Sequence, residues 1–228
     1  MANDYFQFRQ FTVWQDRCAM KVGTDGTLLG AWACGGRTIL DIGTGTGLIA
    51  LMMAQRFPTA SVVGVDIDEN ACQQARQNVD ASPFSVEILH RSVADVEGQY
   101  DCIVSNPPYF EHSLESPDEG RTRARHTSSL SYRLLVTCAW RLLSDDGEFS
   151  VVIPADCRAH LEAEAVLAGF SKSRECAVKT TPRKPPRRYL LAFRKHPSPN
   201  MEQTVGIIET SPSVRSEWYQ ELTKDFYL

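Results

Sequence analysis

The sequence predicts an α/β fold: a doubly wound, mostly parallel sheet of seven strands whose last strand is antiparallel. Two observations lead to this prediction. Apolar runs of strand length alternate with helical segments between residues 38 and 195, and such alternation is typical of parallel strands joined by crossover helices. The last two runs are separated only by the loop 181–188, and a connection that short joins antiparallel neighbours.

Each element follows from a local pattern. Asp68 suits the N-cap of one predicted helix, and Gly169 suits the end of another. Apolar side chains recur with helical spacing at Leu134, Leu135, Cys138 and Leu142. The strands are expected at residues 38–42, 61–65, 85–90, 100–105, 148–153, 170–178 and 189–194. The helices between them are expected at residues 48–56, 69–80, 130–143 and 155–168, and a further helix should open at about residue 25.

A glycine-rich turn, residues 43–47, joins the first predicted strand to the helix that follows it. In α/β folds this turn brings backbone close to a nucleotide-like ligand, and its glycines avoid a Cβ that would block the approach or forbid the required φ. Asp66 follows the second strand, about 20 residues further on, where a carboxylate can accept both ribose hydroxyls. NAD and S-adenosylmethionine (SAM) both meet these requirements.

A second motif, Asn106-Pro107-Pro108-Tyr109, follows the apolar strand 100–105. The Asn106 side-chain oxygen can accept one hydrogen bond. Pro108 removes a backbone donor and favours an extended Pro107, so the Pro107 carbonyl is free to accept a second one. Tyr109 offers a flat face for stacking. The motif therefore predicts a clamp for a planar NH2 group, either an exocyclic amine or a carboxamide, whose lone pair faces an electrophile.

The choice between NAD and SAM depends on residues around the glycine turn. Residues 45–50 also fit the dinucleotide pattern G-x-G-x-x-A. However, Asp41 would repel a pyrophosphate and attract a cationic amino group, and dehydrogenase chemistry has no use for the amine clamp. We therefore expect SAM as the cofactor.

Further contacts to SAM are expected from three other places. The turn before the helix at residue 25 could close over the methionine end, and the segment after the third strand could meet the adenine. The candidate cofactor-binding residues are Lys21, Thr24, Asp25, Asp41, Gly43, Thr44, Gly45, Gly47, Asp66, Ile67, Ser92, Val93 and Asn106.

Domain boundaries are expected at both ends of the predicted sheet. Residues 1–37 form an N-terminal extension that should pack on the cofactor site, residues 38–195 form the methyltransferase domain, and residues 196–228 form a short C-terminal extension. Aromatic residues in the first segment, including Phe8 and Trp14, have two interpretations: a hydrophobic lid on the domain, or an arm that contacts nucleic acid.

Composition restricts the class of protein. The chain has 228 residues, 43% hydrophobic residues and a net charge of −4, which is ordinary for a globular protein. Its seven cysteines include no C-x-x-C pair, so we expect a reducing cytoplasm and no zinc site. We also expect no metal, no secretory signal, no membrane span and no obligate protein partner.

Basic residues gather locally in spite of the negative net charge. Between residues 172 and 195 there are nine Lys and Arg and one acid, Glu175. Such a local positive face would suit a phosphate backbone; a solvated surface without a partner is the alternative. The candidate RNA-contacting residues are Arg121, Arg123, Arg125, Arg183, Lys184, Arg187 and Arg188.

Over nearly its whole length the chain resembles the bacterial tRNA1(Val) adenine-37 N6-methyltransferase family. The resemblance is carried by Phe8-Arg9-Gln10-Phe11, the run from Met20 to Asp25, residues 28–32, the loop from Asp41 to Gly47, Val65–Asp68, Ser105–Phe110, Arg125-His126 and the terminal Lys224–Leu228. The run before the first strand discriminates most, since many methyltransferases share the glycine loop and the clamp.

The resemblance implies a class I, Rossmann-like SAM-dependent methyltransferase that methylates the N6 amine of adenine 37 in a tRNA anticodon loop. The clamp itself does not choose the substrate, because glutamine and guanine also present an NH2 group. Protein glutamine N5-methylation and rRNA guanine N2-methylation therefore stay open as alternatives, and only the resemblance favours adenine.

Overall fold

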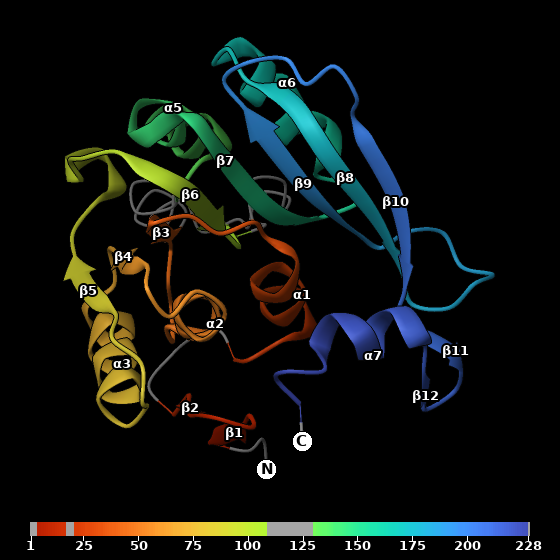
Figure 1. The fold of residues 1–228 in the computed structure, drawn as a ribbon, viewed down its shortest axis with the longest axis horizontal. Helices are drawn as coiled ribbons and strands as arrows, with labels where there is room; N and C mark the ends of the chain where they lie inside the picture. Colours follow the sequence, from red (N-terminus) through yellow and green to blue (C-terminus); the bar gives the residue numbers. More distant parts are fainter. Residues whose placement is uncertain (1–3, 17–20, 109–129, 228) are drawn as a thin grey trace, which may run out of the picture.

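A mixed sheet of eight strands forms the centre of the computed structural model, which describes residues 4–16, 21–108 and 130–227 (Figure 1). Its strand order is β10-β8-β9-β7-β6-β3-β4-β5. In chain order these strands are β3 (Thr38–Ile42), β4 (Ser61–Asp66), β5 (Glu87–His90), β6 (Tyr100–Ser105), β7 (Leu143–Pro154), β8 (Ser171–Lys179), β9 (Arg188–Arg194) and β10 (Glu202–Ile207).

Helices cover both faces of the sheet (Figure 1). The first face carries α1 (Thr24–Trp32), α2 (Leu48–Arg56) and α3 (Glu69–Asp80). The second face carries α5 (Tyr132–Leu142) and α6 (Arg158–Leu167), and the short 3-10 helix η1 (Val93–Asp95) packs on α5. Burial on both faces explains why central strands such as β4, whose residues 62–65 are buried in succession, lack a polar alternation. The predicted doubly wound α/β fold is confirmed.

Strand directions agree with the sequence, with one addition. The pairs β3–β4, β3–β6, β4–β5 and β6–β7 are parallel, and β9 is antiparallel to both β7 and β8. The predicted count of seven strands is wrong for this sheet, because β10 from the C-terminal segment pairs in parallel with β8. Four of its six residues are exposed and a fifth is Gly206, so this edge strand lacks the apolar pattern that would have revealed it.

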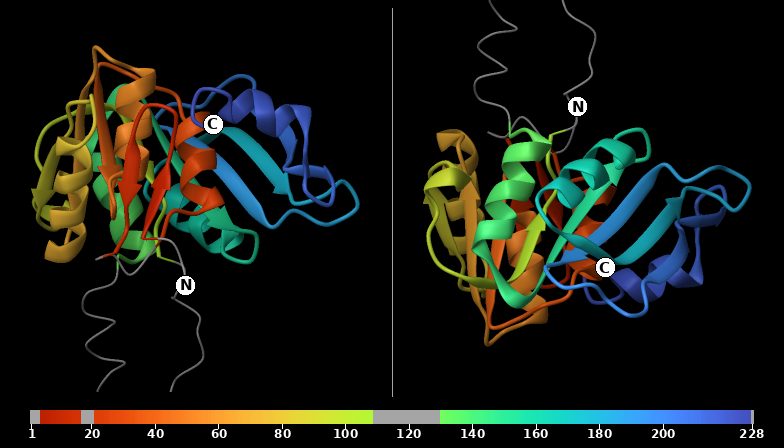
Figure 2. Two further views of the ribbon diagram at one scale, coloured as in Figure 1. Left: turned by 90° about the horizontal axis from the view of Figure 1, so that it is seen from below. Right: turned by 90° about the horizontal axis from the view of Figure 1, so that it is seen from above.

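The two terminal segments pack beside α1 and α2 (Figure 2). Strands β1 (Tyr5–Gln7) and β2 (Thr12–Trp14) form an antiparallel hairpin that buries Phe8, Phe11 and Val13 in a cluster with α2 residues and Phe226. The C-terminal segment continues through β11 (Glu209–Ser211) and β12 (Val214–Arg215) to α7 (Glu217–Thr223), which contacts α1 and β10. The domain boundaries near residues 37 and 195 stay predictions.

Because β3, β4, β6 and β7 are parallel, they end at the same edge of the sheet, here called the carboxyl edge. The loop between β8 and β9 also lies at this edge, since Arg188 at the start of β9 pairs with Pro154 at the end of β7. The glycine turn, the Asn-Pro-Pro segment and the basic loop therefore emerge from one side of the molecule, where open α/β sheets bind their ligands.

Candidate active site

The glycine turn and the Asn-Pro-Pro segment start from adjacent points. Ile42 at the end of β3 is in register with Ser105 at the end of β6. In addition, the Ser105 hydroxyl donates a hydrogen bond of 2.8 Å to the Ile42 carbonyl. Gly43 and Asn106 are the next residues of the two strands. This pairing fixes the predicted amine clamp beside the predicted cofactor loop.

The loop itself has the conformation for which glycine is needed. Gly43, Gly45 and Gly47 have φ angles of 72°, 56° and 80°, a region that other residues rarely adopt. A Cβ built on Gly43 or Gly45 would meet no atom within 4 Å, so the backbone at these two positions borders open space. Gly47 instead lies against Ala75 of α3, at 3.3 Å from an added Cβ. The loop is thus packed on one side and open on the other.

Asp41 is the buried acid of the site. Its Oδ2 accepts hydrogen bonds from the Thr44 hydroxyl at 2.7 Å and from the Ala50 N–H at 3.2 Å. Within the described residues its Oδ1 is buried without a hydrogen-bond partner. Burial raises the pKa of Asp41 to about 7, with a smaller contribution from the charge of Asp66, although the two hydrogen bonds oppose the shift. A cationic group beside Oδ1 would relieve this cost.

Asp66 contacts the glycine turn directly. Its Oδ2 accepts a hydrogen bond of 2.9 Å from the Gly45 N–H, and its Oδ1 accepts one of 3.0 Å from the Asp68 N–H. Each carboxylate oxygen keeps a further lone pair with which it could accept a hydrogen bond from a ribose hydroxyl. Ribose binding stays a prediction. Ile67, the next residue, is 55% exposed although it is apolar.

The predicted adenine-contacting residues follow β5. The Ser92 hydroxyl caps η1 by accepting a hydrogen bond from the Ala94 N–H at 3.2 Å, and Val93 is buried in the core. The Ser92 side chain and the carbonyls of Ser92 and Val93 are therefore engaged in local structure, and the contact of this segment with adenine stays a prediction.

The segment that was expected to close over the methionine end leads into α1. Lys21 is exposed, and Thr24 and Asp25 form the first turn of the helix. The Asp25 Oδ2 accepts a hydrogen bond of 2.6 Å from Arg188 Nε, within an ion pair. This pair ties the start of α1 to the start of β9 at the carboxyl edge.

The structure describes part of the amine clamp. Asn106 is half-buried and has interactions with its surroundings, Pro107 is buried and Pro108 is half-buried. Tyr109, the predicted stacking residue, lies outside the described residues. The clamp therefore remains a prediction whose position, next to Gly43, follows from strand register.

The basic candidates divide into three sets. Arg183, Lys184 and Arg187 are exposed on the β8–β9 loop. Arg188 differs from them, because its side chain is half-buried and paired with Asp25. The other three candidates, Arg121, Arg123 and Arg125, lie outside the described residues.

Two residues of the site were not predicted. Ser105 belongs to a predicted strand and to the resemblance but was given no role, although its hydroxyl donates a hydrogen bond to the Ile42 carbonyl. Asn78 on α3 is fully buried and donates a hydrogen bond of 2.8 Å to the Thr46 carbonyl in the glycine loop. Its place on the helix face of Ala71 and Ala75 was the available signal, because a polar residue on a buried face needs partners.

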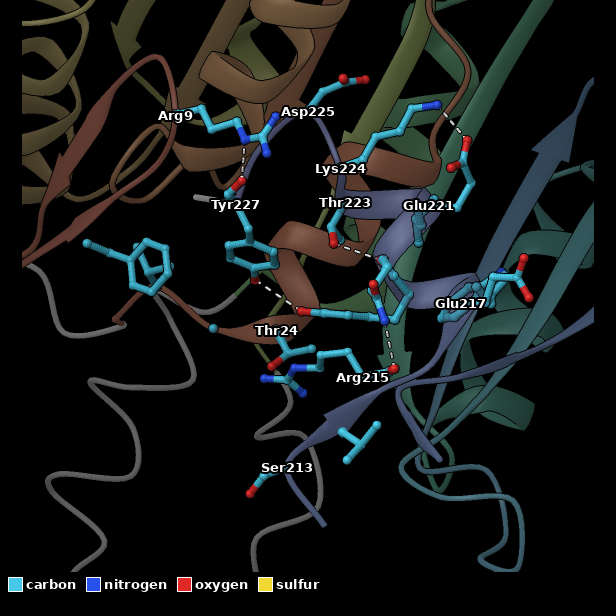
Figure 3. Close-up of a pocket in the computed structure, with 18 residues that line it drawn as sticks. Arg9, Thr24, Ser213, Arg215, Glu217, Glu221, Thr223, Lys224, Asp225 and Tyr227 are labelled. Carbon is cyan, nitrogen blue, oxygen red and sulfur yellow. Dashed lines mark hydrogen bonds and ion pairs between the residues drawn. The ribbon is translucent and has the colours of Figure 1, made fainter. Parts of the chain in front are cut away.

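A groove of about 1920 Å³ lies apart from these motifs, between the N-terminal hairpin, the start of α1 and α7 (Figure 3). Several of its polar side chains are engaged: Lys224 pairs with Glu221, Arg215 with Glu209, and Arg9 donates to the Tyr227 carbonyl. Only Thr24 of the candidate cofactor-binding residues lines it. The groove is thus distinct from the carboxyl-edge motifs.

Metal-binding clusters and membrane-spanning helices are both absent from the described ranges. Residues 4–16, 21–108 and 130–227 contain no group of three or more His, Cys, Asp or Glu side chains that could hold a metal ion. No helix in the same ranges has the length and apolar character needed to cross a membrane.

The chain matches known proteins over its full length. The profile of the family described as Methyltransferase small domain matches residues 28–181. A tRNA1(Val) (adenine(37)-N6)-methyltransferase of Phocaeicola vulgatus is 49% identical over 100% of this chain and 99% of that protein. A protein of the same name from Bacteroides thetaiotaomicron is 45% identical with the same coverage.

Solved structures support the fold. A predicted O-methyltransferase from Agrobacterium tumefaciens superposes with a TM-score of 0.69 at 17% identity, covering 89% of this chain and 96% of that one. The chain therefore belongs to the Methyltransferase small domain family and to the tRNA1(Val) (adenine(37)-N6)-methyltransferase family.

Proposed function

We propose that this protein transfers a methyl group from SAM to the N6 amine of adenine 37 in tRNA1(Val). The observation that carries the proposal is full-length similarity, at 45–49% identity, to proteins named for this reaction. Their names favour adenine over guanine and over protein glutamine, which the amine clamp would accept equally well.

The carboxyl edge fits SAM in three respects. Asp41 has a buried oxygen without a partner among the described residues, and SAM carries a cationic amino group. Gly43 and Gly45 border open space where a ligand can approach the backbone. Ile67 exposes an apolar side chain directly after Asp66, which suits the face of an adenine next to a ribose.

The chain's own residues supply positioning. When bound, SAM supplies an electrophilic methyl group on its sulfonium. Asn106 and the Pro107 carbonyl would accept hydrogen bonds from the two N–H groups of the adenine amine, which favours a more tetrahedral nitrogen with an available lone pair. The pairing of Ser105 with Ile42 keeps this clamp beside the cofactor loop. Most of the acceleration would come from this near-attack geometry.

The exposed basic loop supports a nucleic-acid substrate. Arg183, Lys184 and Arg187 lie at the carboxyl edge, on the same side of the sheet as Asn106. Phosphate contacts from such residues would position the tRNA without reading its sequence. Arg188 is better explained as a partner of Asp25 than as an RNA contact. A tRNA substrate would be met in the cytoplasm.

The test is direct. The protein is incubated with methyl-labelled SAM and unmodified tRNA1(Val) transcript, and the RNA is digested for nucleoside analysis. We expect labelled N6-methyladenosine from the wild-type transcript and none from a transcript with guanine at position 37. Label in N2-methylguanosine, or in protein glutamine when lysate is added, would replace the proposal with the corresponding alternative.

A further inference from the structure

The side-chain amide of Asn78 joins three segments of the chain. Its Oδ1 accepts a hydrogen bond of 2.8 Å from the Trp14 N–H, and its Nδ2 donates to the Trp14 carbonyl at 2.9 Å. The same Nδ2 donates its second hydrogen to the Thr46 carbonyl at 2.8 Å. Asn78 is fully buried. One amide therefore connects α3, the end of hairpin β1–β2 and the cofactor loop.

This arrangement uses the full donor capacity of the amide. A primary amide has two N–H donors, and here each has a carbonyl partner. The paired bonds to Trp14 hold its peptide as a neighbouring strand would, although β2 ends there. Ala75, one turn earlier on α3, lies against Gly47, so the same helix face holds both Thr46 and Gly47 of the loop.

The hairpin also reaches the other side of the site. Gln15, the residue after Trp14, is buried, and its Oε1 accepts a hydrogen bond of 2.7 Å from the Val22 N–H. Val22 leads directly into Gly23 and the first turn of α1. Residue 15 is therefore hydrogen-bonded to the segment that enters α1, and residue 14 is connected to the glycine turn through Asn78.

From these contacts we infer that Asn78 is a positioning residue, through which the N-terminal hairpin fixes the cofactor loop in its binding conformation. The inference rests on the proposed function only in taking SAM as the ligand of the loop. It gives the N-terminal segment a role beyond that of a hydrophobic lid. Because the coupling is reciprocal, SAM binding should in turn stabilise the hairpin.

The variant that tests the inference is Asn78→Asp, which keeps the size of the side chain but removes both donors and sets a carboxyl group against two carbonyls. We expect the dissociation constant and the KM for SAM to rise about tenfold, the ratio that corresponds to one ordinary hydrogen bond. We expect kcat at saturating SAM to stay close to the wild-type value. Gln77→Glu is the matched control, since it makes the same chemical change at an exposed position of the same helix.

A purely structural role for Asn78 would lower the melting temperature without changing SAM affinity in the folded protein, and that result would overturn the inference. Hydrogen exchange on the wild-type protein gives a second readout that needs no variant. We expect added SAM to slow exchange at the Trp14 and Val22 amides, and unchanged exchange at both would also overturn the inference. Binding of SAM by the wild type, measured first, separates these outcomes from failure of the proposed function.

Discussion

Two buried carboxylates of the same sheet, Asp41 on β3 and Glu148 on β7, have opposite electrostatic surroundings. The Glu148 carboxylate forms ion pairs with the guanidinium groups of Arg174, at 2.6 Å, and Arg194, at 3.2 Å. Burial alone would raise the pKa of Glu148, but Arg174 and Arg194 outweigh it and hold that pKa below its ordinary value. The hydrogen-bond partners described for Asp41 carry no charge, and its pKa rises to about 7.

This difference in charge partners distinguishes a carboxylate that stabilises the fold from one that we expect to bind a ligand. A buried ion pair is complete, and its removal costs stability because the partner charges remain. A buried carboxylate without a cation destabilises the ligand-free protein. Such groups are typical of binding sites, where a cationic ligand supplies the missing charge. The β7–β8–β9 half of the sheet is therefore held by its own ion pairs, whereas we propose that a cationic ligand completes the β3–β4–β6 half.

The largest expected effect concerns catalysis in the β3–β4–β6 half. Asn106→Ala should lower the methyl-transfer rate by roughly 10²-fold or more, because the amine loses an acceptor that orients it. The SAM dissociation constant should change far less than the rate, because Asn106 is only one of many candidate SAM contacts, as calorimetry would report. Retention of activity in this variant would remove the clamp from the mechanism.

The second expected effect is on the free energy of unfolding, and its sign is opposite for the two carboxylates. Glu148→Gln should lower the free energy of unfolding by about 3 kcal/mol, because the half-buried Arg174 is left without its charge partner. SAM affinity of the folded protein should stay unchanged. Asp41→Asn should instead raise the unfolding free energy at pH 8, by on the order of 4 kcal/mol, and weaken SAM binding. Urea unfolding and calorimetry on both variants would show whether the reversal exists.

The pH dependence of stability should identify Asp41 separately. A carboxyl group whose pKa is raised in the folded state contributes stability below its unfolded value, near 3.8, and this contribution is lost as the pH rises through about 7. The unfolding free energy of the ligand-free wild type should thus fall relative to Asp41→Asn between these two values. Parallel curves for the two proteins over this range would argue against the raised pKa.

The smallest expected effect concerns the basic loop. Replacing Arg183, Lys184 and Arg187 by Gln should weaken tRNA binding and flatten its salt dependence by about 0.7 in slope per lost phosphate contact. Lys195→Gln is the control, because Lys195 follows the other end of β9 and pairs with Asp145. An equal change per charge in both proteins would indicate a non-specific effect of net charge.

Sequence reasoning was sufficient where function is concentrated in a contiguous motif. Asp41 could be singled out because it directly precedes the glycine turn, and Asn106 because it starts a motif at a strand end. The α/β fold followed from the alternation of apolar strands and helices, and the antiparallel β9 from its short connection.

The remaining features depend on contacts between distant residues. Arg188 looked like a member of a basic run, but its partner Asp25 is 163 positions away in the sequence. Asn78 and Trp14 are 64 positions apart. Strand β10 has almost no buried side chains, so only its pairing with β8 identifies it. Local patterns contain no information about such partners.

Proton release on SAM binding tests the central claim most directly. At pH 6 a carboxyl group with a pKa of about 7 is mostly protonated, whereas an α-amino group is already charged. Calorimetry in two buffers of different ionisation enthalpy would count the protons released. We predict about one proton for the wild type and for Glu148→Gln, and none for Asp41→Asn. Equal release by the wild type and Asp41→Asn would contradict the account of Asp41 as the carboxylate that a cationic ligand completes.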